Sequence, residues 1–124
     1  MILKTGVDLI EIQRIQQVLE RHGDRFLQRI YTSNEIDQSR EKPPELAVRF
    51  AAKEAASKAL GTGIGIISWQ DVEVYSHPSG EPHLRLHGPA RQIARARGLT
   101  TWAVSLSHSR EMAIAVVVAS GGDS

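Results

Sequence analysis

The chain has 124 residues, of which 41% are hydrophobic and 23% charged, and its formal net charge is +1. These values are typical of one globular domain around one core, so we expect residues 1–124 to form a single domain. The near-neutral charge argues against a general nucleic-acid-binding protein, whose surface would be strongly basic.

No cysteine is present, which excludes disulfides, thiolate metal ligands and a cysteine nucleophile. The first residues lack the apolar core of a signal peptide because Lys4, Asp8 and Glu11 interrupt it. No apolar run approaches the length of about eighteen residues that a membrane-spanning helix needs. We therefore expect a soluble, cytoplasmic protein with no membrane segment.

The N-terminal part is predicted to be a strand followed by helices. Residues 2–9 resemble a strand, and apolar residues at helical spacing predict a helix over residues 9–21 that ends at Gly23. Asp8 would then lie at the strand-to-helix junction, where a helix N-cap explains it as well as a chemical role does. After a short helical segment over residues 24–30, the phrase TSNE at residues 32–35 reads as a capping box.

The main helix is predicted over residues 44–60. The two prolines at 43 and 44 suit its first turn, and Gly61 suits its C-terminal stop. Its apolar stripe is mostly alanine, which lets another element approach closely. The helix also carries Glu54 and Lys58 four residues apart, and an ion pair between them worth about 0.2–0.5 kcal/mol would explain both.

The second half changes to the alternation of strands. Residues 71–78 and 82–87 predict a hairpin with its turn at 79–80, and a basic amphipathic helix follows over 88–97. Two more strands are expected over 101–108 and 112–119, and residues 119–124 are expected to be a loose tail. The order of these elements predicts an α+β fold with an antiparallel sheet packed on one long helix.

A single helix stop does not explain why Gly61, Gly63 and Gly65 follow the main helix so closely. Closely spaced glycines let backbone amides approach an anion, and Lys58 one turn earlier could add a charge for a phosphate. The run is not a Walker A loop, and it follows a helix C-terminus, where the partial charge is negative. By itself it is a weak signal.

Asp8 and Glu54 would form a Mg²⁺ site if the fold brings them together, because Mg²⁺ takes one or two protein carboxylates beside phosphates and waters. The five histidines are scattered and no HExxH is present, so a zinc enzyme is disfavoured. No GxSxG is present either, which disfavours a serine hydrolase.

Three blocks together resemble the signature of the holo-acyl-carrier-protein synthases, the small bacterial type of 4′-phosphopantetheinyl transferase. They are GVDLIEIQRI at residues 6–15, RFAAKEAASKALGTGIG at 49–65 and SLSHSREMAIAVVV at 105–118. The resemblance implies transfer of 4′-phosphopantetheine from coenzyme A to a serine of apo acyl carrier protein, in support of fatty acid biosynthesis. It also implies a homotrimer with active sites between subunits.

The resemblance also implies roles for individual residues. Asp8 and Glu54 would bind Mg²⁺, and Glu54 and Lys58 would be catalytic, with Lys58 on the coenzyme A phosphates. The residues that would line the coenzyme A site are Ser57, Lys58, Gly61, Thr62, Gly63 and His108. The base that deprotonates the carrier serine is either Glu54 or a metal-bound water.

A basic face on the first helices would dock the acidic carrier protein. Arg14, Arg21, Arg25 and Arg29 fall close together, and the resemblance places Arg14 at the docking site with the other three beside it. A solvated helix face explains the same arginines without any partner.

Two other classes of function stay open at this point. One is a non-catalytic oligomeric module that binds a nucleotide or an acidic protein through the arginines. The other is a transferase of the wider family that acts on peptidyl or polyketide carrier domains, although the chains of that branch fold two similar halves together.

Overall fold

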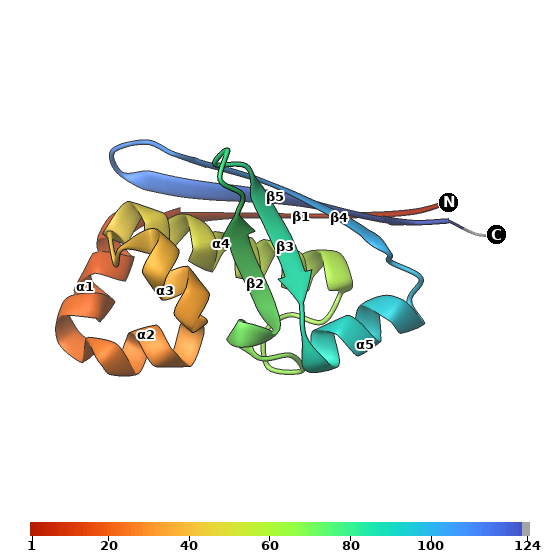
Figure 1. Ribbon diagram of the computed structural model, residues 1–124, viewed down its shortest axis with the longest axis horizontal. Coiled ribbons are helices and arrows are strands. Elements are labelled where there is room, and N and C mark those ends of the chain that lie inside the picture. Colours follow the sequence, from red (N-terminus) through yellow and green to blue (C-terminus); the bar gives the residue numbers. More distant parts are fainter. Residues whose placement is uncertain (123–124) are drawn as a thin grey trace.

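The computed structural model describes residues 1–122 and has a three-stranded antiparallel sheet with the helices on one of its faces (Figure 1). The elements in chain order are β1 (Ile2–Glu11), α1 (Ile12–His22), α2 (Asp24–Ile30), α3 (Ser33–Ser39), α4 (Pro43–Leu60), the 3-10 turn η1 (Trp69–Asp71), β2 (Val72–Ser76), β3 (Pro82–Leu86), α5 (Gly88–Ala96), β4 (Thr101–His108) and β5 (Met112–Gly121). This is the predicted α+β architecture.

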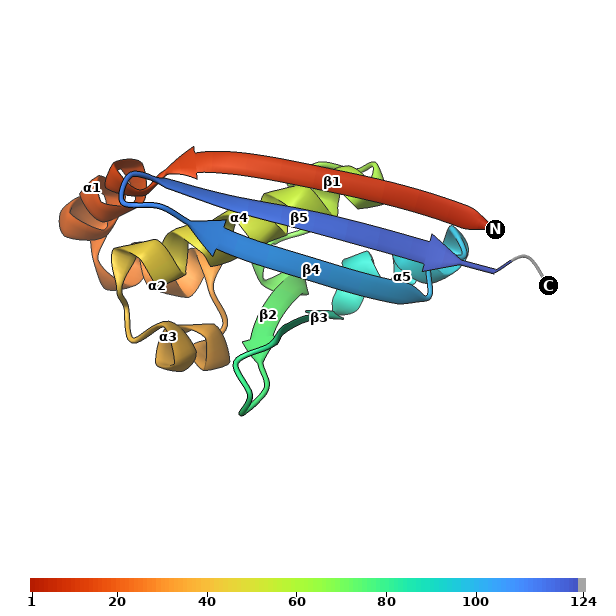
Figure 2. The ribbon, with the colours of Figure 1, turned by 90° about the horizontal axis from the view of Figure 1, so that it is seen from above.

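The main sheet has the order β1-β5-β4, so that the C-terminal strand lies in its centre (Figure 2). Successive side chains of β5 alternate between its two faces. Ala115 and Val117 are fully buried against the helices, whereas Val116 and Val118 on the outer face are 39% and 37% exposed. A separate two-stranded sheet, the predicted hairpin, is formed by β2 and β3.

The long helix α4 lies under β1 and β5 and forms the middle of the core (Figure 2). Its alanines at 51, 52, 55 and 56 have no exposed surface, which confirms the predicted alanine stripe. Gly6 of β1 is the matching small residue. A Cβ added to Gly6 would lie 1.9 Å from the backbone oxygen of Ala55, so only glycine lets the strand come this close to the helix.

The helices α1, α2 and α3 form a second core at one end of α4. Tyr31 anchors this core, because its hydroxyl donates a hydrogen bond of 2.8 Å to the carbonyl of Leu46. The predicted capping box starts α3: the Thr32 hydroxyl accepts from the Glu35 amide at 3.2 Å, and the Glu35 carboxylate accepts from the Thr32 amide at 2.9 Å.

Two predicted boundaries were wrong because strand pairing extends both ends of the sheet. β1 runs to Glu11, which pairs with Met112, and α1 begins only at Ile12. β5 runs to Gly121, which pairs with Ile2, so residues 119–121 belong to a strand and not to a loose tail. The last two residues of that predicted tail, 123 and 124, lie outside the described part of the chain. No described helix has the length and apolar character needed to cross a membrane.

Candidate functional site

Asp8, Glu54 and Lys58 lie together where β1 crosses α4. The Lys58 ammonium donates to the Asp8 carboxylate at 3.3 Å and to the carbonyl of Val7 at 3.0 Å. Asp8 and Glu54 line one pocket of about 370 Å³, which we call the carboxylate pocket. The structure therefore brings together three side chains from two distant segments of the sequence.

Neither of the simpler explanations for these carboxylates applies. Asp8 lies inside β1, paired with Ala115, and the N-cap of α1 is Glu11, so Asp8 does not cap a helix. Lys58 contacts Asp8 in place of the expected ion pair with Glu54. Within residues 1–122, no side chain or amide donates a hydrogen bond to the Glu54 carboxylate.

The two carboxylates repel each other. Burial raises the pKa of Glu54, the Asp8 carboxylate raises it further, and Lys58 opposes them. A bound cation relieves such repulsion, and a pair of carboxylates suits Mg²⁺, which keeps several waters in its coordination shell. Among the described residues, no group of three or more His, Cys, Asp or Glu side chains could hold a metal ion.

The glycine-rich loop caps α4 with its own amides. Gly61 has a φ of 83°, the left-handed conformation typical of a helix C-cap. The amides of Gly61, Thr62 and Gly63 all point back to the carbonyl of Ser57, at 3.0, 3.1 and 3.3 Å. Because these three amides are hydrogen-bonded to the end of α4, they are not free to bind a phosphate. A ligand could contact only the exposed surface of the loop.

None of the six predicted coenzyme A residues lines the carboxylate pocket itself, although Lys58 contacts Asp8 at its edge. Ser57 is fully buried, and its hydroxyl donates to the carbonyl of Glu54 at 2.7 Å, so its side chain does not reach the pocket surface. His108 ends β4 and lines a different pocket of about 210 Å³, which we call the histidine pocket. In one chain, the predicted site is thus divided into two parts.

The histidine pocket contains a cation that the sequence prediction missed. Arg49 is only 3% exposed, and its guanidinium bonds the carbonyl and the carboxylate of Glu45 at 3.0 and 2.9 Å. Its Nε atom is buried and has no hydrogen-bond acceptor among the described residues. The other oxygen of the Glu45 carboxylate lies 3.9 Å from His108, so Arg49, Glu45 and His108 form one polar cluster at this pocket.

The predicted docking arginines are all exposed, and three of the four border pockets. Arg14 lines the carboxylate pocket itself. Arg25 and Arg29 line the adjoining pocket, which shares Phe26 with the carboxylate pocket. Arg21 is exposed on the same helix, α1, but lines neither pocket. A basic surface therefore continues from the carboxylate pocket across α1 and α2.

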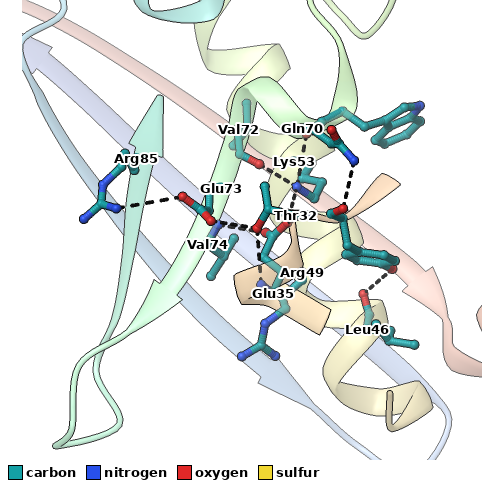
Figure 3. A network of polar contacts seen from close by, with 12 residues as sticks. Thr32, Glu35, Leu46, Arg49, Lys53, Gln70, Val72, Glu73, Val74 and Arg85 are labelled. Atoms are coloured by element: carbon teal, nitrogen blue, oxygen red, sulfur yellow. Dashed lines mark hydrogen bonds and ion pairs between the residues drawn. The ribbon is translucent and has the colours of Figure 1, made fainter. Parts of the chain in front are cut away.

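A buried ion pair joins α4 to α3 (Figure 3). Lys53 and Glu35 have no exposed surface, and the Lys53 ammonium donates to Glu35 at 2.7 Å and to the carbonyls of Val72 and Trp69 at 2.5 and 3.1 Å. Burial lowers the pKa of Lys53, and Glu35 opposes that shift. Three acceptors satisfy the three donors of the ammonium, which a buried charge requires.

Polar contacts extend from this ion pair to the hairpin. Thr32 donates a hydrogen bond of 2.6 Å to Glu73, and His87 and Arg85 lie 3.0 and 4.0 Å from the same carboxylate. Burial raises the pKa of Glu73, but the bonds from Thr32 and His87 outweigh it and hold the pKa below its usual value. The network therefore joins α3, α4 and the hairpin (Figure 3).

Lys53 also fixes a wall of the carboxylate pocket. It holds the backbone of Trp69, whose ring stacks on Phe50 with centroids 4.6 Å apart, and Phe50 lines the pocket beside Glu54. This role of Lys53 was not predicted from the sequence, because Lys53 and Glu54 are consecutive helix residues and nothing local shows which of the two charges is buried.

The profile of the 4′-phosphopantetheinyl transferase superfamily matches residues 4–117. The chain belongs to this superfamily. Its sequence is 50% identical to the holo-[acyl-carrier-protein] synthase of Herpetosiphon aurantiacus, over 96% of this chain and 99% of that protein. It is 47% identical to the same enzyme of Koribacter versatilis, over 95% of this chain and 98% of that protein.

Solved structures agree with the sequence comparison. The holo-[acyl-carrier-protein] synthase of Helicobacter pylori in complex with coenzyme A has a TM-score of 0.86 and 34% identity, and the match covers 94% of this chain and 99% of that one. The enzyme of Neisseria meningitidis has a TM-score of 0.85 and 31% identity, with 94% and 97% covered. The resemblance predicted from the three sequence blocks is confirmed.

Proposed function

We propose that this protein transfers 4′-phosphopantetheine from coenzyme A to a serine of apo acyl carrier protein, releasing adenosine 3′,5′-bisphosphate, in support of fatty acid biosynthesis in the cytoplasm. The observation that carries the proposal is the cluster of Asp8, Glu54 and Lys58 in a chain of this superfamily. The relatives named as holo-[acyl-carrier-protein] synthases support the choice of substrates.

In this proposal Asp8 and Glu54 would hold Mg²⁺, which would supply positive charge to the pyrophosphate of coenzyme A. Lys58 is 53% exposed in its side chain and already lies at the carboxylates, so its ammonium can turn to a phosphate oxygen at the same place. Glu54 lines the pocket where the carrier serine would enter, so it can take the serine proton directly or through a water.

We further propose a homotrimer whose sites lie between subunits. Support comes from the division of the predicted site, because the carboxylate pocket and the histidine pocket have no lining residue in common. Coenzyme A would lie between the carboxylate pocket of one subunit and the histidine pocket of the next, where Arg49 and His108 can contact a phosphate. Gly61, Thr62 and Gly63 would form the surface between them.

The outer face of the sheet supports the same assembly. Leu3, Val7 and Leu9 of β1 are 61%, 51% and 60% exposed there, and Val116 and Val118 adjoin them in β5. No helix covers this face in Figure 1. Monomeric proteins rarely expose an apolar area of this kind. We therefore expect two further copies of the chain to pack against this face in the trimer.

The carrier protein would dock on the arginine face. Acyl carrier proteins are acidic, and Arg14, Arg21, Arg25 and Arg29 would steer them toward the carboxylate pocket. Arg14 borders that pocket, so a carrier helix bound there places its serine near Glu54.

The decisive experiment is the intact mass of apo acyl carrier protein after incubation with this protein, coenzyme A and Mg²⁺. The expected gain is about 340 Da, one phosphopantetheine group, and EDTA should abolish it. The variant Asp8→Asn, which keeps the shape of the side chain and removes its charge, should lose most of the gain as well. A mass gain that persists in EDTA would refute the metal site, and no gain with any of several carrier proteins would refute the activity.

The shared site is tested by mixing two inactive variants, Asp8→Ala and His108→Ala. If each site takes Asp8 from one subunit and His108 from another, about a quarter of the sites in randomly mixed trimers regain both residues and activity returns. If both residues act within one subunit, mixing restores nothing.

A further inference from the structure

Another pocket lies beside α5 and the start of β4. Figure 1 shows α5 at the end of the molecule opposite α1. The pocket has a volume of about 530 Å³ between β3, α5 and β4, and we call it the α5 pocket. This is the size of an ordinary small-molecule site. It shares no lining residue with the carboxylate pocket or the histidine pocket, so the proposed transferase reaction does not account for it.

The walls of the α5 pocket are cationic and its floor is apolar. Arg91 and Arg95 rise from α5, and no Asp or Glu lines the pocket. The apolar floor is formed by Leu86, Leu99 and Trp102. Leu99 is almost completely buried in the main core. A ligand for such a site needs a negatively charged group and an apolar part.

The charge of Arg91 and Arg95 is not compensated within the described residues. Two other basic side chains at the rim, Arg85 and His87, have Glu73 as a partner at 4.0 and 3.0 Å. Arg91 and Arg95 have no hydrogen-bond acceptor or ion-pair partner in residues 1–122. They are four residues apart on one face of α5, where like charges repel each other, and an anion between them would remove that repulsion.

We propose that the α5 pocket binds a phosphate monoester that carries an apolar group. Two guanidinium groups match the double charge of a phosphate monoester and can each bond two of its oxygens. The apolar group lies on Leu86 and against the indole of Trp102. The pocket is therefore a second ligand site, separate from the coenzyme A site and independent of the proposed transfer reaction.

The indole of Trp102 offers a direct readout. The chain has two tryptophans, Trp69 and Trp102, so the variant Trp69→Phe leaves Trp102 as the only indole and keeps an aromatic ring on Phe50. In that background we would titrate monohexyl phosphate, inorganic phosphate and hexanol while following the tryptophan fluorescence. Monohexyl phosphate should cause a saturable change and bind about tenfold or more tightly than either comparison compound.

The variants Arg91→Glu and Arg95→Glu should each raise the Kd for monohexyl phosphate about tenfold or more. Arg110→Glu is the matched control, because it makes the same charge change at an exposed arginine that does not line the α5 pocket. An equal loss in Arg110→Glu would show that only net charge matters and would overturn the proposal. Equal binding of inorganic phosphate would overturn it too.

Discussion

Replacing Gly6 by alanine is expected to separate β1 from α4 and to move Asp8 away from Glu54. The added Cβ would lie 1.9 Å from the Ala55 oxygen, whereas real Cβ atoms essentially never approach closer than 3.0 Å. The strand or the helix must therefore shift by about 1.1 Å, since the obstacle is backbone that cannot rotate away. Mg²⁺ tolerates ligand displacements of only about 0.2 Å.

We expect two measurable effects of Gly6→Ala. Overpacking of this kind costs about 1–3 kcal/mol of unfolding free energy, which lowers Tm by roughly 3–12 °C in a chain of this length. The Mg²⁺ concentration for half-maximal transfer should rise, and the rate at saturating Mg²⁺ should fall by up to about a hundredfold, because a displacement near 1 Å can cost that much in rate.

Gly122→Ala is the matched control, because a Cβ added there meets nothing within 4 Å and no positive φ is involved. It should leave Tm and the Mg²⁺ dependence unchanged. A Gly6→Ala variant that keeps its Tm to within about 1 °C and the same Mg²⁺ dependence would refute the reasoning that this glycine sets the distance between the carboxylates.

Three further predictions concern single side chains. The folded-state pKa of Glu54 is raised, so its ionisation costs stability as the pH rises through that pKa. In EDTA, Glu54→Gln should therefore have the same Tm as the parent protein below about pH 4 and a higher Tm at pH 7. A Tm difference that does not change with pH would contradict this. Lys53→Met should lower the unfolding free energy in urea titrations by about 3–5 kcal/mol, because it leaves the Glu35 carboxylate buried without its partner. The double variant with Glu35→Gln should recover part of the loss. A loss below about 1 kcal/mol in Lys53→Met would show that the buried pair is dispensable. Arg14→Glu should raise the KM for acyl carrier protein by about tenfold with little change in the KM for coenzyme A, because a charge at the rim acts mainly on association. Equal rises in both KM values would show that Arg14 does not dock the carrier protein.

Local patterns in the sequence were enough to predict most of the helices and strands. The capping box at Thr32 and Glu35, the alanine stripe of α4 and the stop at Gly61 depend on residues only a few positions apart, and the structure has all of them. The ends of β1 and β5 were predicted wrongly, because Glu11 and Gly121 owe their strand conformation to partners at the other end of the chain. A short segment of sequence does not show which distant strand it will pair with, so such ends cannot be predicted from local patterns.

The sequence by itself determined the elements, the family and the residue types of the candidate site. Only the tertiary structure decided that Asp8 and Glu54 share a pocket, that Lys58 contacts Asp8, and that His108 lies in a second pocket. It also decided that Lys53 is buried while its neighbour Glu54 faces the site, although both read as ordinary helix charges. The physical reason is that burial and charge repulsion depend on which distant segments the core brings together, and in this chain the close approach of Gly6 to α4 makes that choice.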